Sequence, residues 1–230
     1  MPDRNSISLS RRALLTGCAA LSAGAAFSGS TRRPVYARRK FDPQRFIEEC
    51  RKAVARPDAQ AGIRELLARE IADPQSVLAG VGAPTKGGLN TLYRSPELTI
   101  LNIVWSPLMQ LLPHEHRMWA LVGIYTGRED NIFWRRDAGR LSAVNATAIS
   151  SGMPVALPSD VIHSVNNPIE KLTGAIHIYG GDFFSVHRSE WDPETLTERD
   201  WNINEAVRNF RESNARFFGA ANPRCQKGQS

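Results

Sequence analysis

Three histidines form the most specific chemical pattern in this sequence. Pro113-His114-Glu115-His116 places two histidines two positions apart, and His163 belongs to a second pattern further along the chain. In a β-strand, residues i and i+2 point to the same side, so His114 and His116 would present two imidazoles on one face at the start of a strand. Imidazole binds Fe, Zn, Ni and Cu alike. The sequence therefore predicts a metal site built from His114, His116 and His163.

The surroundings of these histidines resemble the two cupin motifs. The segment around His163 reads Gly152-x5-Pro158-x-Asp160-x2-His163-x3-Asn167. It resembles the second cupin motif, G-x5-P-x-G-x2-H-x3-N, with Asp160 in place of the second glycine. In the first motif, G-x5-H-x-H-x3,4-E-x6-G, the last glycine is Gly127, whereas Leu108 and Ala120 occupy the first glycine and glutamate positions. The implied ligand set is three histidines with open positions, which is typical of a catalytic site.

Short β-rich segments separated by turn residues surround these motifs. They are Leu89–Arg94, Leu98–Trp105, Met118–Tyr125, Asn131–Arg135, Leu141–Ile149, Val155–Leu157, Val161–Val165 and Leu172–Tyr179. Many short strands at this spacing favour an all-β barrel or sandwich. Together with the motifs, they predict an all-β core, a cupin double-stranded β-helix (jelly-roll) barrel with N-terminal and C-terminal helices. We expect the barrel to span residues 89–185.

Helical patterns flank the expected barrel on both sides. Residues 38–88 contain apolar residues at helical spacing, in one group at Phe46, Cys50 and Val54 and in another at Ile63, Leu66, Leu67 and Ile71. In the C-terminal segment, 186–230, Asp192-Pro193-Glu194 has the form of a helix start. A second C-terminal helix is expected from Asn204 to Phe217.

Residues 1–37 have the features of an export signal and linker. Ser10-Arg11-Arg12-Ala13-Leu14-Leu15 resembles the twin-arginine consensus, and an apolar stretch and small-residue cleavage candidates follow it. We expect export to the periplasm by the twin-arginine machinery, and no transmembrane segment in the mature chain. Cys50 and Cys225 remain after processing, and in an oxidising compartment they could pair.

The high net charge belongs to the same leader. The whole chain carries 29 basic and 23 acidic residues, but residues 1–40 hold eight of the basic residues and only one acid. The remainder has 21 basic and 22 acidic residues, so it is close to neutral. No basic face is left to neutralise phosphates, and we expect no nucleic-acid partner.

Within the cupins, the sequence resembles the cysteine dioxygenase family of thiol dioxygenases. The strand after His163 reads Ala175-Ile176-His177-Ile178-Tyr179, the glutamate ligand is absent, and Gly180-Gly181-Asp182-Phe183 follows directly. The resemblance implies one Fe(II) per chain, held by the three histidines, with His177 and Tyr179 as an outer catalytic pair. It also implies a small carboxylate-bearing thiol and O2 as substrates. An arginine would bind the carboxylate, with Arg94 the first candidate and Arg117 the second.

The sequence departs from this family at two positions. Ala175 stands where the family has a serine, and Ala120 stands where the eukaryotic enzymes have a cysteine linked to the tyrosine. His177 and Tyr179 could instead be ordinary core residues, and Arg94 a solvated strand-edge arginine. Another divalent metal, a non-thiol substrate, or an exported module that binds a ligand without turnover are the alternative hypotheses.

Overall fold

The computed structural model describes residues 40–138, 140–152 and 154–219. These residues belong to one compact unit. The predicted export signal and Cys225 lie outside the described residues. Cys50 is buried without a disulfide partner among the described residues, and the predicted pairing stays untested. None of the described helices is both long and apolar enough to cross a membrane.

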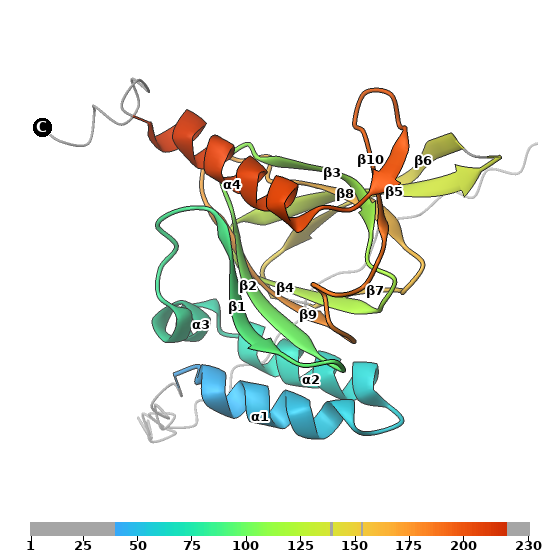
Figure 1. Cartoon of the computed structure of the whole chain (residues 1–230). Coiled ribbons are helices and arrows are strands. Elements are labelled where there is room, and N and C mark those ends of the chain that lie inside the picture. The colour runs from blue at the N-terminus through green and yellow to red at the C-terminus, as the bar shows by residue number, and fades with distance from the viewer. Residues whose placement is uncertain (1–39, 139, 153, 220–230) are drawn as a thin grey trace, which may run out of the picture. The chain divides into compact units, whose positions relative to one another are not determined.

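Two antiparallel sheets form the body of this unit (Figure 1). The first sheet has the strand order β1 (Gly88–Arg94), β2 (Thr99–Trp105), β9 (Thr173–Tyr179), β4 (Ala120–Thr126) and β7 (Val155–Leu157). The second has the order β11 (Glu198–Asp200), β10 (Ser189–Trp191), β3 (Gln110–Glu115), β8 (Ile162–Asn166), β5 (Arg128–Asp137) and β6 (Arg140–Ser150). This strand order confirms the predicted cupin-type double-stranded β-helix.

Helices precede and follow the sheets, as predicted. They are α1 (Pro43–Val54), α2 (Ala59–Ile71), α3 (Pro74–Val81) and α4 (Ile203–Phe218). Local chemistry starts α1 at Pro43, because the Asp42 carboxylate accepts hydrogen bonds from the next free backbone N–H groups, those of Gln44 and Arg45. Asp73 and Asn202 cap α3 and α4 in the same way.

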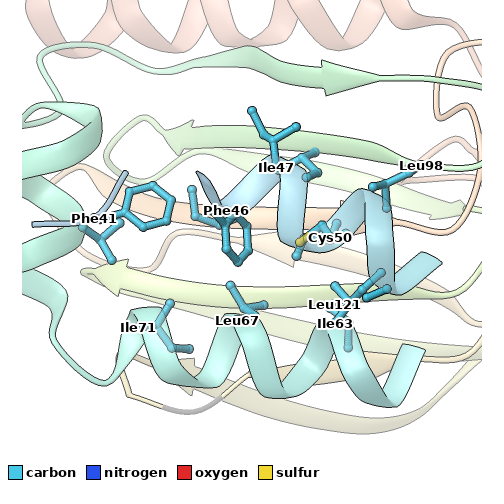
Figure 2. Close-up of a cluster of buried hydrophobic side chains, with 14 of the residues drawn as sticks. Phe41, Phe46, Ile47, Cys50, Ile63, Leu67, Ile71, Leu98 and Leu121 are labelled. Atoms are coloured by element: carbon cyan, nitrogen blue, oxygen red, sulfur yellow. The ribbon is translucent and has the colours of Figure 1, made fainter. Parts of the chain in front are cut away.

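Side chains of β9 alternate between the two faces of the first sheet, and each face packs against a different hydrophobic core. Ile176 and Ile178 face the helices, where they join residues such as Leu67 of α2. Figure 2 shows the α1 and α2 side chains of this cluster packed together with Leu98 and Leu121. Ala175 and Tyr179 face the other way, into the core between the two sheets. All seven residues of β9 are buried for this reason.

Two local predictions from the sequence are wrong. The histidine pair lies at the end of a strand that had not been predicted, β3, instead of at the start of the next one. The helix expected from Asp192 is a hairpin of β10 and β11, so the second sheet extends beyond residue 185. Asp192 does accept hydrogen bonds from the N–H groups of Glu194 and Thr195, but these bonds close a turn, which Asp stabilises as readily as a helix start.

Candidate metal centre

The three predicted ligand histidines lie together on two neighbouring strands. His114 in β3 is directly opposite His163 in β8, and His116 follows the last residue of β3. Nε2 of His116 is 3.1 Å from Nε2 of His114 and 3.3 Å from Nε2 of His163. All three side chains are buried, and one ligand atom from each lies within 4.8 Å of the others. The histidines thus share a single point inside the protein.

The partners of the outer ring nitrogens show which nitrogens carry protons. Nδ1 of His114 is 3.0 Å from the Leu112 carbonyl oxygen, and Nδ1 of His163 is 2.7 Å from Oδ1 of Asn131. Each oxygen requires an N–H donor, which leaves a lone pair on Nε2 of both rings. Nitrogens about 2.1 Å from one ion lie about 3.0 to 3.4 Å apart at octahedral or tetrahedral angles. Both separations measured from Nε2 of His116 match that range, so the site fits a divalent cation.

Burial keeps the three imidazoles in the neutral form that binds metal. It lowers the pKa of His114 to about 4 and the pKa values of His116 and His163 well below their ordinary value. Charge on the neighbouring histidines lowers the pKa values of His116 and His163 further. At neutral pH no second proton therefore competes for Nε2 of His114 and His163.

His177 and Tyr179 lie beside the histidine cluster, on the opposite sheet. The Tyr179 hydroxyl is 3.3 Å from Nδ1 of His177, and the Tyr179 ring centroid is 5.1 Å from that of His116. Burial raises the pKa of Tyr179, so its phenol keeps the proton. Ala120 is opposite Tyr179 in the neighbouring strand, and its methyl group cannot form the cross-link known from the family. The structure therefore places both residues of the predicted outer pair at the site.

A buried carboxylate that sequence reasoning missed lies behind these residues. Glu129 of β5 accepts hydrogen bonds from Trp105 Nε1 at 2.8 Å and from Asn131 Nδ2 at 3.0 Å. His177 Nε2 is 3.6 Å from Glu129 Oε2, slightly beyond hydrogen-bond length. Burial raises the pKa of Glu129, but these donors and the His177 charge outweigh it, and the pKa lies below its usual value. Strand alternation in β5 was the available signal, since it puts Glu129 and Asn131 on the inner face.

The two predicted substrate-binding arginines are not among the residues that line the cavity at the histidines. Arg94 lies at the exposed end of β1, where its guanidinium binds both carboxylate oxygens of Asp182 at 2.8 and 2.9 Å. Arg117 has a backbone φ of 59° and donates to Glu115 at 2.6 Å. Neither guanidinium is buried. Their role in binding a carboxylate stays a prediction.

Arg188 is the buried arginine of the described residues, and no sequence pattern marked it. Its guanidinium carbon is 3.5 Å from the ring centroid of Trp201 and 4.3 Å from that of Phe183. Nη1 donates to the Phe183 carbonyl oxygen, whereas Nε and Nη2 have no hydrogen-bond partner. Burial lowers the pKa of Arg188 to about 10, so the group is still charged at neutral pH. Its charge lowers the pKa values of His114 and His116 in addition to the larger effect of burial. For Tyr179, burial raises the pKa and outweighs the opposite effect of the Arg188 charge.

A small cavity of about 30 Å³ opens at the three histidines, enough for roughly one water molecule. Like Arg94 and Arg117, Arg188 is not among its lining residues, because Phe183 and Trp201 lie over the guanidinium. The polar lining of the cavity is the three histidines with His177 and Tyr179. Its apolar wall includes Phe183, Trp201 and, from α4, Phe210. A larger hollow of about 890 Å³ is lined by residues of β5, β6 and β8 and includes none of the three histidines. A substrate at the metal site must therefore be small, or side chains of the apolar wall must move.

Two glycine positions of the cupin motifs are still glycine in this chain, and a third has glycine-like backbone geometry. Gly127 and Gly152 have φ values of 82° and 114°, where a side chain would be strained. Leu108, at the first glycine position, also has a positive φ of 56°. The chain therefore keeps the turn geometry of the first motif there although the residue type has changed.

Comparison with known proteins gives weak similarities to cupins. No family model matches the chain. An RmlC-like cupin family protein with a double-stranded β-helix fold from Methanocaldococcus jannaschii aligns at 15% identity and a TM-score of 0.37, covering 44% of this chain and 85% of the other. The cupin domain of Cnp3 from Schizosaccharomyces pombe aligns at 9% identity and a TM-score of 0.34, covering 41% and 60%.

A third similarity is to a metalloenzyme. A single-residue variant of Bacillus subtilis oxalate decarboxylase aligns at 18% identity and a TM-score of 0.36, covering 44% of this chain and 27% of the enzyme. Another structure of that enzyme, at the same identity, TM-score and coverage, is described with Mn(II) centres. The matched region thus spans about a quarter of the decarboxylase.

Fold and site together define the class of this protein. Its own strand order is that of the cupin double-stranded β-helix, and its buried histidine cluster fits a divalent metal. The chain has a cupin-type double-stranded β-helix fold, and its three-histidine cluster is a candidate site for a divalent metal.

We expect His163→Ala to lower metal affinity by at least about 100-fold, because it removes one of three ligands. Binding of Co(II) to the apoprotein, followed by absorption and by competition with a chelator, measures the loss. His187→Ala is the matched control, since His187 is exposed and contacts Asp200. Equal affinity of the His163→Ala variant and the unaltered protein would rule out His163 as a ligand.

We also expect the apoprotein to lose stability as the pH falls from about 7 towards 4. An unfolded histidine binds a proton below its ordinary pKa of 6.5, whereas buried His114 resists protonation until about pH 4. The unfolded state then binds more protons, so lowering the pH favours unfolding, on the order of 3 kcal/mol for this one group. Urea unfolding across this range measures the slope. The slope should become shallower in His114→Gln and stay unchanged in His187→Gln.

Proposed function

We propose that this protein is an iron-dependent thiol dioxygenase that converts a small carboxylate-bearing thiol to a sulfinate. The observation that carries the proposal is the Tyr179 hydroxyl, hydrogen-bonded to His177 beside a metal site made only of histidines. A site of this composition has neutral ligands, and its remaining positions are free for substrates. Other divalent metals bind imidazole too, so iron is part of the proposal.

The proposed reaction is balanced without a further reductant. One thiol and one O2 combine to give one sulfinic acid, in which both oxygen atoms are bonded to sulfur. Sulfur loses four electrons and O2 accepts all four, and the acid then releases its proton to solvent. Ferrous iron held by His114, His116 and His163 would supply the redox chemistry that lets O2 react with the sulfur.

The residues of the chain would bind, orient and shield the reactants. Because burial keeps Tyr179 protonated, its hydroxyl can donate a hydrogen bond to a reactant in the cavity. His177 would hold that hydroxyl in place by donating from Nδ1 to the phenol oxygen, which leaves the phenol proton for the reactant. The apolar wall around Phe183 and Phe210 would exclude water, which strengthens each polar contact inside the cavity.

Arg188 is the group that best suits a substrate carboxylate. A buried guanidinium with two unpartnered nitrogens lacks its hydrogen bonds, and a carboxylate could accept both in a bidentate contact. Arg94 would first have to give up its ion pair with Asp182. A substrate carboxylate would then replace one ion pair with another and add little stabilisation. Movement of Phe183 or Trp201 would be needed, because their rings cover the Arg188 guanidinium.

Export to the periplasm by the twin-arginine machinery is also part of the proposal. It rests on the sequence of residues 1–37. A metal chosen in the cytoplasm and carried out within a folded protein would suit that route, because metal selectivity depends on availability as well as affinity.

Oxygen consumption tests the proposed activity. The Fe(II)-loaded protein should consume one O2 per thiol with cysteine or 3-mercaptopropionate, and mass spectrometry should show the sulfinate. Tyr179→Phe should lower kcat by about 10- to 100-fold, because the hydroxyl is lost while the ring remains. Tyr93→Phe, remote in the helix-facing core, is the control. Absence of uptake with every small thiol, with iron bound, would exclude a dioxygenase of thiols and leave the metal site in place.

A comparison of two thiols tests the role of Arg188. Arg188→Lys should lower kcat/KM for 3-mercaptopropionate by about 10- to 100-fold, since the bidentate contact is lost, and should change kcat/KM much less for 2-aminoethanethiol, which has no carboxylate. Arg94→Ala and Arg117→Ala are tested beside it. A selective loss in either of these variants, and not in Arg188→Lys, would return the role to the arginines predicted from sequence.

A further inference from the structure

The carboxylate of Glu129 lies next to three side chains at the site, and the proposed reaction gives it no role. The carboxylate is completely buried, and its two oxygens are shared among three side chains. Oε1 accepts from Asn131, and Oε2 accepts from Trp105 and lies 3.6 Å from Nε2 of His177. A buried carboxylate is retained only where such donors and charges offset its desolvation.

Two branches lead from this carboxylate towards the metal site. In one branch, Asn131 accepts from Nδ1 of His163 at 2.7 Å, so the amide links Glu129 to a metal ligand. In the other, His177 lies between Glu129 and the Tyr179 hydroxyl, which is 3.3 Å from its Nδ1. One carboxylate therefore reaches both a metal ligand and the phenol, each through one intervening side chain.

The strands make this arrangement rigid. Glu129 and Asn131 lie on the inner face of β5, which pairs with β8, the strand of His163. His177 belongs to β9 in the other sheet. Glu129 thus spans the space between the sheets, and Trp105 of β2 fixes it from the side of β9.

We propose that Glu129 is a positioning residue that holds His163 and the His177–Tyr179 pair in register with each other. Through Asn131 it fixes the orientation of the His163 ring. Through His177 it fixes the Tyr179 hydroxyl, and so provides the partner that Ala175 cannot supply. The second half of this inference rests on the proposed thiol oxidation, whereas the first half concerns metal binding alone.

Charge gives Glu129 a second effect on the metal. The three ligands are neutral, and Arg188 adds a buried positive charge nearby. A divalent cation in this interior needs a buried anion, and Glu129 supplies one behind His163. An anion in that position also makes the ligand imidazole a stronger donor, and loss of such partners lowers metal affinity by about 10- to 100-fold.

The key variant is Glu129→Gln, which keeps the size of the side chain and removes its charge. Co(II) affinity of the apoprotein should fall by about 10- to 100-fold, and the Co(II) absorption spectrum should change. Glu129→Asp should recover part of the affinity. Glu190→Gln is the matched control: this buried carboxylate lies opposite His114 but is paired with Arg199 and has no link to a ligand ring.

Two further variants separate the branches. Asn131→Ala should lower Co(II) affinity and change the Co(II) absorption spectrum, because it breaks the path from Glu129 to His163. His177→Gln should leave Co(II) affinity within about 3-fold and lower kcat for thiol oxidation. Glu129→Gln should show both effects. The loss of affinity in the double variant with Asn131→Ala should be smaller than the sum of the two single losses, because both changes break the same path, while the charge of Glu129 acts on the metal without Asn131.

The outcomes are separable from those of the proposed function. Unchanged Co(II) affinity and spectrum in a folded Glu129→Gln protein would overturn the positioning role. If the unaltered enzyme oxidises no thiol, the proposed function fails, but the Co(II) measurements still decide whether Glu129 supports the ligand. Additive losses in the double variant would show that Glu129 does not act on His163 through Asn131.

Discussion

Three imidazole lone pairs that converge inside a protein repel one another unless a cation joins them. In this chain two of the lone pairs are fixed, because His114 and His163 each use Nδ1 to donate a hydrogen bond and so turn the lone pair of Nε2 towards His116. Burial keeps the rings neutral at neutral pH, so each ring has a lone pair to offer a cation. The rest of the body serves this constraint: two sheets hold the rings in position, and an apolar wall keeps water away from them.

The histidine cluster could be predicted from sequence because its geometry is local. A spacing of two residues places His114 and His116 on one side of an extended chain, and the motif around His163 fixes the turn that precedes its strand. Alternation of apolar residues likewise identified most strands and the cores of α1 and α2. These signals depend on nearest neighbours in the chain, and they agreed with the fold.

The places of Glu129 and Arg188 at the site could not be predicted, because they depend on contacts between distant strands. Nothing in the sequence around Glu129 indicates that His177, on the opposite sheet, lies next to it. Arg188 follows the last long strand and is buried only because Trp201 and Phe183 close over it. Asp192 shows the reverse error: its local signal was real, but a turn used it instead of a helix.

Strand β9 has a consequence for how this protein tolerates change. Its odd-numbered residues serve the site, while Ile176 and Ile178 fill the core beneath the helices. If β9 shifted its register by one residue, Tyr179 and His177 would point into the hydrophobic core beneath the helices. Ile176 and Ile178 would then point towards the histidine cluster. The N-terminal helices therefore fix the register of β9, and with it the position of the site residues, because any other alignment would bury polar side chains against them.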